Sequence, residues 1–240
     1  MRYWWVNQNQ TFHQEVAGGY LWSPKRNAKG ARNPFYESMR EVSPGDLIFS
    51  FANTRVAAVG IARSYCWECP KPSEFGSVGQ NWENIGWRVN VSFSQLLNKI
   101  RPKDHMEVLR AVLPDRYSPL QANGNGIQSI YLTELSEEFA EVLGGLIGEE
   151  ARSLIAAAES GAVVENGRIV TGDDLDVWES RLEHQIEADA SVKETDRDAL
   201  VRARRGQGLC SLTYRSQDRK GQHQRRRSAW PSLQRRGLRN

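Results

Sequence analysis

Short apolar runs separated by turn residues dominate the first 150 residues, and they predict several strands with a few helices. Residues 3–8 open the chain as an aromatic, β-favouring run, and residues 87–93 alternate apolar and polar positions as a half-buried strand does. Residues 127–132 show a weaker form of the same alternation. We therefore expect a small β-barrel with added helices.

A hairpin and two helices complete this pattern. The apolar runs 47–51 and 56–64 flank Ala-Asn-Thr-Arg, and the preceding Ser-Pro-Gly-Asp predicts a tight turn, since Pro44 fixes φ and Gly45 tolerates a positive φ. Helical spacing in residues 136–147, with Ser136 as N-cap, predicts one helix, and residues 33–41 predict a shorter one. No repeat or regular strand–helix alternation is seen, so the expected fold class is α+β.

Charge divides the chain into three parts. Residues 1–150 carry a net charge of −1, residues 151–201 carry −7, and residues 202–240 carry +11. We expect a globular domain over residues 1–148, an acidic helical connector over 149–205, and a disordered basic tail over 206–240, where periodicity is lost. A basic tail suits a polyanionic partner such as nucleic acid.

The sequence favours a cytoplasmic protein without membrane contact. The first residues lack the apolar core of a secretory signal, and no run reaches the roughly 18 apolar residues of a membrane span. The three cysteines are too few for a disulfide framework and suit a reducing compartment.

No motif indicates catalysis or a bound cofactor. Cys66-x-x-Cys69 is half of a zinc site at most, because no second pair stands at ligand spacing, and the prolines after it do not suit a redox helix. No hydrolase, kinase or nuclease signature is present, and none of the histidines shares a spacing with a carboxylate pair. We therefore predict no catalytic residue, no metal ligand and no cofactor.

The tryptophans offer a better functional signal. Trp4 and Trp5 are adjacent on a predicted strand, so they must point to opposite faces. Trp22 lies in the basic segment 21–33, which we interpret as a loop. Its ring could stack on a base while the neighbouring cations hold phosphate. Alternatively, the ring packs in the core beneath a basic surface loop.

Several motifs together resemble the EVE domain, a member of the PUA-like superfamily related to the YTH domain. They are Tyr-Trp-Trp-Val-Asn-Gln at 3–8, Leu-Trp-Ser-Pro-Lys-Arg at 21–26, Asn-Pro-Phe-Tyr at 33–36, Ser-Pro-Gly-Asp-Leu-Ile-Phe-Ser-Phe at 43–51 and Ala-Ala-Val-Gly-Ile-Ala-Arg-Ser at 57–64. The resemblance covers about residues 1–148. It implies a small PUA-like β-barrel with flanking helices.

The segment after this domain resembles the linker of bacterial EVE–HNH proteins, which are modification-dependent restriction endonucleases. Val-Trp-Glu at 177–179, Glu-Thr-Asp-Arg at 194–197 and Arg-Ala-Arg-Arg-Gly-Gln-Gly at 202–208 carry this likeness. The chain departs from the pattern after Gly208, where a single later histidine, His223, replaces the expected HNH cluster. We expect a frameshifted or degraded end, no DNA cleavage, and a divalent metal only in relatives that keep the HNH domain.

The resemblance also implies a site and a ligand. In such a domain Trp22 would be the stacking wall, Asn7 and Ser23 would bind the base edge, Phe51 would give apolar contact, and Trp5 would be a second wall. Gln8 and Phe49 would complete the pocket, and the phosphate contacts would be Lys25, Arg26, Lys29 and Arg32. The expected partner is double-stranded DNA carrying 5-methylcytosine or a related modified cytosine, read by base flipping. RNA or modified RNA is the alternative partner, and an enzyme acting on a small molecule is a third reading.

Overall fold

The computed structural model describes residues 1–160, 163–165, 168–170 and 184 of the 240-residue chain. The strands are β1 (Tyr3–Asn7), β2 (Tyr20–Pro24), β3 (Leu47–Ala52), β4 (Arg55–Ala62), β5 (Trp67–Pro70), β6 (Ile85–Gln95), β7 (Leu132–Leu135), β8 (Val163–Glu165) and β9 (Arg168–Val170). The helices are α1 (Phe12–Gly18), α2 (Pro34–Glu37), α3 (Met106–Leu109), α4 (Glu137–Ile147) and α5 (Glu149–Glu159). Short 3-10 turns lie at Ser38–Glu41, Ser73–Phe75, Pro102–His105 and Arg110–Val112.

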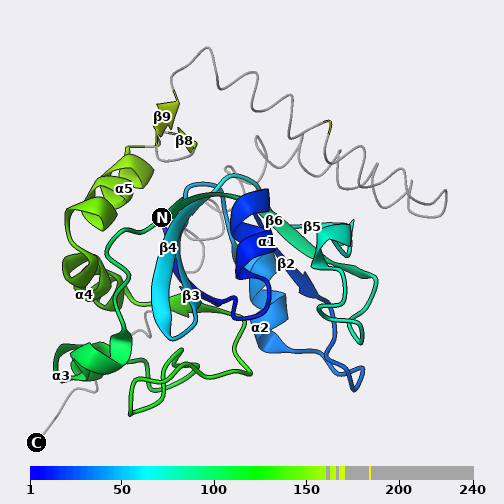
Figure 1. Ribbon diagram of the computed structural model, residues 1–240, viewed down its shortest axis with the longest axis horizontal. Coiled ribbons are helices and arrows are strands. Elements are labelled where there is room, and N and C mark those ends of the chain that lie inside the picture. Colours follow the sequence, from blue (N-terminus) through cyan, green and yellow to red (C-terminus); the bar gives the residue numbers. More distant parts are fainter. Residues whose placement is uncertain (161–162, 166–167, 171–183, 185–240) are drawn as a thin grey trace, which may run out of the picture.

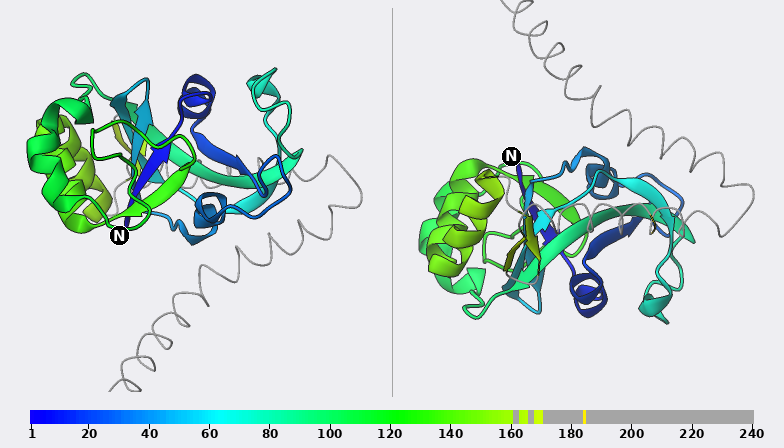
Figure 2. Two further views of the ribbon diagram at one scale, coloured as in Figure 1. Left: turned by 90° about the horizontal axis from the view of Figure 1, so that it is seen from below. Right: turned by 90° about the horizontal axis from the view of Figure 1, so that it is seen from above.

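A strongly curved mixed sheet forms the centre of the molecule (Figure 1). Its strand order is β2-β6-β4-β3-β1-β7, and β5 adds to the first half of the long strand β6. Helices α3, α4 and α5 cover one side of the sheet, and α1 and α2 lie on the other side (Figure 2). The fold is α+β, as the sequence predicts.

Strand β1 divides the core in two. It pairs with β3 in parallel and with β7 antiparallel, so both of its hydrogen-bonding edges are occupied, and its side chains enter two separate core clusters. Trp5 packs with Phe139 of α4 on one face, and Trp4 lies on the other face in the core cluster that includes Phe12 of α1. The prediction that the two adjacent tryptophans point to opposite faces is confirmed.

The predicted hairpin is confirmed as β3 and β4. Asn53 and Thr54 join the strands with φ of 50° and 66°, the left-handed pair that a tight two-residue turn requires. In the turn before β3, Gly45 has φ of 90°, and its amide donates to the carbonyl of Ala62 at 2.9 Å. Both turns thus take the conformation that their residues favour.

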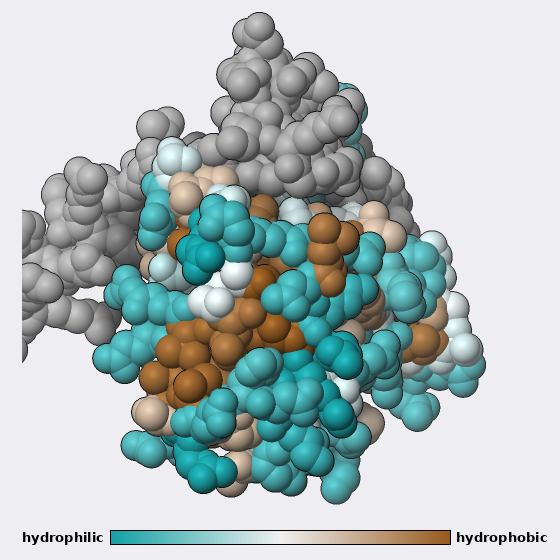
Figure 3. Space-filling view, turned by 60° about the vertical axis from the view of Figure 1, so that its left-hand side comes forward, coloured by the Kyte–Doolittle hydropathy of each residue, from teal (hydrophilic) through white to brown (hydrophobic). Residues whose placement is uncertain are grey.

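Helices α4 and α5 pack in one core. Ser136 caps α4 by accepting a hydrogen bond from the amide of Phe139 at 3.2 Å, as expected. Helix α5 lies beyond the predicted boundary at residue 148, yet it buries Leu154, Ala157 and Ala158 in the same core as α4. The compact unit therefore extends through α5. Figure 3 shows apolar side chains gathered on the outer face formed by these helices.

Most of the predicted connector 149–205 and the predicted tail 206–240 lies outside the described residues. Beyond residue 160, the structure describes the short antiparallel pair β8–β9 and the exposed His184.

Two expected elements are placed differently. The segment interpreted as a loop from residue 21 begins as strand β2. Its side chains are buried on both faces, so the sequence lacks the alternation of polar and apolar residues that would have predicted a strand. Residues 127–131 are a loop rather than a strand. The amide of Ile130 donates to the carbonyl of Ile127 in a local turn, and the amide of Ile127 donates to the carbonyl of Pro119 in the preceding loop, so neither amide joins the ladder with β1.

Candidate functional site

A cavity of about 530 Å³ opens where the curved sheet brings its two edge strands together, at the end of β1. Strand β2 forms one wall, and the loop that leads into β7 forms another. Helix α2 and the segment before β6 complete it. The lining residues are Asn7, Asn9, Gln10, Thr11, Trp22, Ser23, Pro24, Asn27, Asn33, Tyr36, Trp82, Gln128, Ser129, Ile130 and Tyr131.

The lining is neutral, polar and aromatic. None of the lining residues carries a formal charge; amides, hydroxyls and four aromatic rings predominate. Amides offer both donors and acceptors, and rings offer flat apolar faces. Such a surface matches a planar, uncharged ligand with hydrogen-bonding groups along its edge.

Trp82 is the more accessible of the two tryptophans in the cavity. Its ring is half-buried and stacks on Trp22, with centroids 6.1 Å apart and an interplanar angle of 27°. Phe75 meets both rings edge-on. Trp22 itself is 1% exposed, and its Nε1 donates to the carbonyl of Cys69 at 3.4 Å. Trp22 therefore supports the wall that Trp82 presents.

Two glycines make room for these rings. A Cβ atom on Gly79 would stand 2.1 Å from the ring of Trp82, and one on Gly86 would stand 2.4 Å from the ring of Trp22. Gly79 also has φ of 65°, a backbone conformation that other residues rarely adopt. The two tryptophan rings can therefore take these positions only because Gly79 and Gly86 carry no side chain.

Ser23 carries a polar atom without a partner. Its Oγ is fully buried and makes no hydrogen bond within the described part of the chain. An unsatisfied buried hydroxyl costs free energy, and such groups occur where a ligand or water completes the site. Asn7, by contrast, already donates from Nδ2 to the carbonyl of Ile127 at 3.3 Å.

Glu15 of α1 lies directly behind the cavity and is fully buried. Its Oε1 accepts hydrogen bonds from the amide of Trp22 at 2.7 Å and from the hydroxyl of Tyr131 at 2.6 Å. Its Oε2 accepts from Gln8 Nε2 and from Thr11 Oγ1, both at 2.7 Å. Burial raises the pKa of Glu15 to about 7, although all four donors act in the opposite direction.

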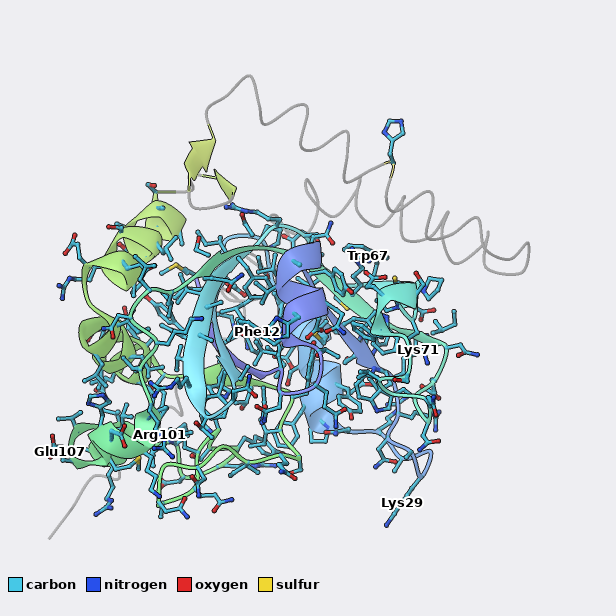
Figure 4. The ribbon with its side chains drawn as sticks, viewed as in Figure 1. Phe12, Lys29, Trp67, Lys71, Arg101 and Glu107 are labelled. Carbon is cyan, nitrogen blue, oxygen red and sulfur yellow. The ribbon has the colours of Figure 1, made fainter. Side chains whose placement is uncertain are left out.

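The basic segment after β2 borders the cavity through Asn27. Lys29 projects from its tip, away from the body of the molecule (Figure 4). Arg26 and Arg32 are also exposed and face each other across a short bridge. Lys25 differs, because its Nζ pairs with Glu68 at 2.6 Å and lies 4.8 Å from the centre of the Trp87 ring.

The structure brings together only part of the residue set implied by the resemblance. Asn7, Trp22 and Ser23 line the cavity. Trp5, Phe49 and Phe51 do not line it, because they lie in the core cluster that includes Phe139 of α4. Gln8 is 1% exposed, donates to Glu15 and accepts from Ser50, so it supports the wall from behind.

Sequence reasoning missed Trp82, Tyr36, Tyr131 and Glu15. Trp82 stands in a stretch of glycines and asparagines without periodicity, and Tyr131 stands at the end of a run read as a strand. The Thr-x-x-x-Glu spacing of Thr11 and Glu15 resembles an ordinary helix start. No local signal indicates that these residues meet.

The Cys66-x-x-Cys69 pair is not part of this site. Burial raises the pKa of Cys66 well above its usual value, which disfavours the reactive thiolate, and the thiol of Cys69 donates to the carbonyl of Pro70 at 3.1 Å. Among the described residues, no group of three or more His, Cys, Asp or Glu side chains could hold a metal ion. Within the same residues, no helix is long and apolar enough to cross a membrane.

No family model matches the sequence, and no curated protein matches it. Solved structures do show similarity. A protein from Pseudomonas putida aligns at 13% identity over 61% of this chain and 99% of its own, with a TM-score of 0.42. Human THYN1 protein, in complex with DNA containing 5-methylcytosine, aligns at 13% identity over 62% of this chain and 99% of its own, with a TM-score of 0.41. The Pho92 YTH domain, in complex with m6A, aligns at 14% identity over 61% and 85%, with a TM-score of 0.39.

Proposed function

We propose that this chain binds a modified nucleobase flipped out of a nucleic acid, with modified cytosine in duplex DNA as the first candidate. The observation that carries the proposal is the neutral cavity lined by Trp82, Tyr36 and amide side chains, with the unpartnered hydroxyl of Ser23 at its wall. A nucleobase is a flat, uncharged ring with donors and acceptors on its edge. Its faces match the rings, and its edge matches the amides and the hydroxyl.

The energetic balance is plausible for this cavity. Taking a base out of a duplex costs a few kcal/mol. Stacking on an aromatic ring returns roughly 1–3 kcal/mol, and hydrogen bonds to the base edge add to it. One methyl group changes affinity by about 1–3 kcal/mol in an apolar pocket, so discrimination between modified and unmodified bases is expected to be modest.

The cations beside the cavity fit the phosphate backbone. Arg26, Lys29 and Arg32 are exposed on the segment that borders the cavity through Asn27, and no carboxylate binds their charged groups among the described ion pairs. A base held in the cavity would leave its flanking phosphates near such groups. Phosphate contacts position the nucleic acid, while the cavity reads the base.

DNA rather than RNA is our first choice because the linker resembles that of EVE–HNH restriction endonucleases. Those linker motifs lie outside the described residues, so the restriction context is an expectation from the sequence. RNA carrying a modified base is the second candidate, because the neutral lining of amides, hydroxyls and rings fits a flipped base from either nucleic acid.

A binding panel with the full chain tests the proposal. Fluorescence polarisation would compare labelled duplex DNA with one 5-methylcytosine, the same duplex unmodified, and single-stranded RNA with or without m6A. We expect the methylated duplex to bind about tenfold more tightly than the unmodified one. Equal affinity for every probe would contradict a reader of modified bases, and preference for m6A RNA would favour the second candidate.

A matched pair of variants separates the cavity from the rest of the surface. Trp82→Ala removes the accessible ring and should abolish the preference between the two duplexes, with a loss of roughly 1–3 kcal/mol on the methylated one. Trp87→Ala removes another half-buried tryptophan, which does not line the cavity, and should leave the preference intact. If both variants kept the preference, Trp82 would not be the stacking wall.

A further inference from the structure

The two edges of the curved sheet meet at one carboxylate. Trp22 lies on the edge strand β2, and Tyr131 immediately precedes the opposite edge strand β7. Both donate to Oε1 of Glu15. No backbone ladder joins β2 to β7, and the amide of Trp22 also donates to the hydroxyl of Tyr131 at 3.1 Å. The Glu15 carboxylate and this hydroxyl together link the two walls of the cavity from behind.

The number of donors matches an ionised carboxylate. A carboxylate offers four acceptor positions on two oxygens, and Glu15 receives four hydrogen bonds, two on each oxygen. A protonated carboxyl group accepts fewer hydrogen bonds and must place a hydroxyl proton of its own. Protonation would therefore oblige at least one donor to turn away, or one hydroxyl donor to reverse and accept the new proton.

We propose that ionised Glu15 is the positioning residue that holds β2 and the loop before β7 at the spacing needed to bind the ligand. Three of its four donors, Thr11, Trp22 and Tyr131, themselves line the cavity. Loss of one of these hydrogen bonds would change the shape of the wall that faces the base. This inference rests on the proposed function, because it assigns a role to Glu15 in the binding of that ligand.

Among the titratable groups that face one another around Glu15, the carboxyl group of Glu15 is the one expected to change its protonation near neutral pH. Tyr131 and Tyr20 of β2 are the titratable groups that face it, and burial raises the pKa of both. Arg88 of β6 lies over the ring of Tyr20 at 4.2 Å, while the hydrogen-bond donors of Glu15 include no Lys, Arg or His. His13 of α1 is exposed.

Stability and affinity should then respond to pH in opposite directions. Burial raises the pKa of Glu15 from 4.5 to about 7, so the folded state takes up a proton that the unfolded state releases. The stabilisation from that proton is complete below pH 4.5 and is lost as pH rises through about 7. Ligand binding needs the ionised form and should strengthen over the upper part of the same range. A purely structural carboxylate would make affinity follow stability.

The test measures both quantities on the full chain between about pH 6 and about pH 8.5. The probe is the labelled duplex with one 5-methylcytosine, and thermal melting reports stability. For the parent we expect affinity to rise about tenfold with pH while the melting temperature falls. Glu15→Gln should bind weakly and without this pH dependence. Glu150→Gln, which alters a carboxylate bonded to the amide of Leu97, and His13→Gln should behave like the parent.

Tyr131→Phe provides a second variant if Glu15→Gln fails to fold. The hydrogen bond from Tyr131 lowers the pKa of Glu15, so its removal should shift the midpoint of the binding curve to higher pH. An unchanged midpoint, or a pH dependence that survives in Glu15→Gln, would overturn the role of Glu15.

The two proposals fail in different ways. Failure of every DNA and RNA probe to bind at any pH would contradict the proposed function. In that case, the rate of hydrogen exchange at the Trp22 amide, compared between the variants at one pH, tests the role of Glu15 without any ligand. Faster exchange in Glu15→Gln than in the parent would support the link between the walls, and equal rates would overturn it.

Discussion

At the scale of single residues, two tryptophans share the role that the sequence assigned to Trp22 alone. Trp22 is buried beneath Trp82 and holds it, while Trp82 offers an accessible ring. Truncation of Trp22 would therefore cost roughly 3–5 kcal/mol of stability as a core residue, and its effect on binding would be hard to interpret. Sequence reasoning can indicate that an aromatic ring belongs near the cations, but burial decides which ring meets the ligand.

Ser23→Ala tests the hydroxyl that lacks a partner. Because the Oγ of Ser23 is buried without a hydrogen bond, its removal should leave stability unchanged or raise it by up to about 1 kcal/mol. The same change should weaken binding of the methylated duplex by about tenfold, because a base edge would lose its partner. Urea unfolding and polarisation titration measure the two effects. A clear loss of stability would show instead that the hydroxyl already has a structural partner.

At the scale of elements, the sequence predicts those features that depend on neighbouring residues in the chain. The hairpin β3–β4, the Ser136 cap and the opposite faces of Trp4 and Trp5 follow from turn chemistry, capping and strand periodicity. Strand β2 was missed because it is buried on both faces. The segment that presents Trp82 has no periodicity, and its conformation depends on glycines and on long-range packing.

Gly79→Ala tests whether that segment must keep its shape for binding. A Cβ atom there meets the ring of Trp82 and also strains a backbone with φ of 65°. Gly76→Ala is the matched control, since Gly76 has φ of 55° but open space around its Cβ position. Both variants should lose about 1–3 kcal/mol of stability, while only Gly79→Ala should lose the preference for the methylated duplex. Equal binding by the two variants would show that the position of Trp82 does not matter.

At the scale of the whole molecule, the described part combines a nearly neutral body with a small group of exposed cations beside one cavity. The α+β class and the division of charge along the chain could be predicted from composition and periodicity. The meeting of β2 with the loop before β7 could not, because it results from the curvature of the whole sheet. Trp22, Tyr131 and Glu15 are far apart in sequence, and only this closure brings them together.

Lys29→Ala and Lys25→Ala test whether an exposed lysine contributes more than an ion-paired lysine to the salt dependence of DNA affinity. Lys29 is exposed at the loop tip, so its loss should weaken modified and unmodified duplexes alike and reduce the slope of log affinity against log salt by about 0.9. Lys25 is paired with Glu68 and should change the slope less. The basic residues after position 202 would also attract DNA through their positive charge. Each variant is therefore compared with its parent, which carries the same tail, at several salt concentrations. Equal slopes for the parent and Lys29→Ala would remove Lys29 from the interface.

The position of the flipped base in the complex can be measured by photochemical crosslinking. A duplex with 5-iodocytosine at the modified position would be crosslinked to the full chain by light, and the crosslinked peptides would be mapped by mass spectrometry. If the base occupies the cavity, crosslinks should form at its aromatic residues, Tyr36, Trp82 and Tyr131. Crosslinks confined to the segment of residues 25–32 or to the face of α3–α5, with none in the cavity, would contradict this placement.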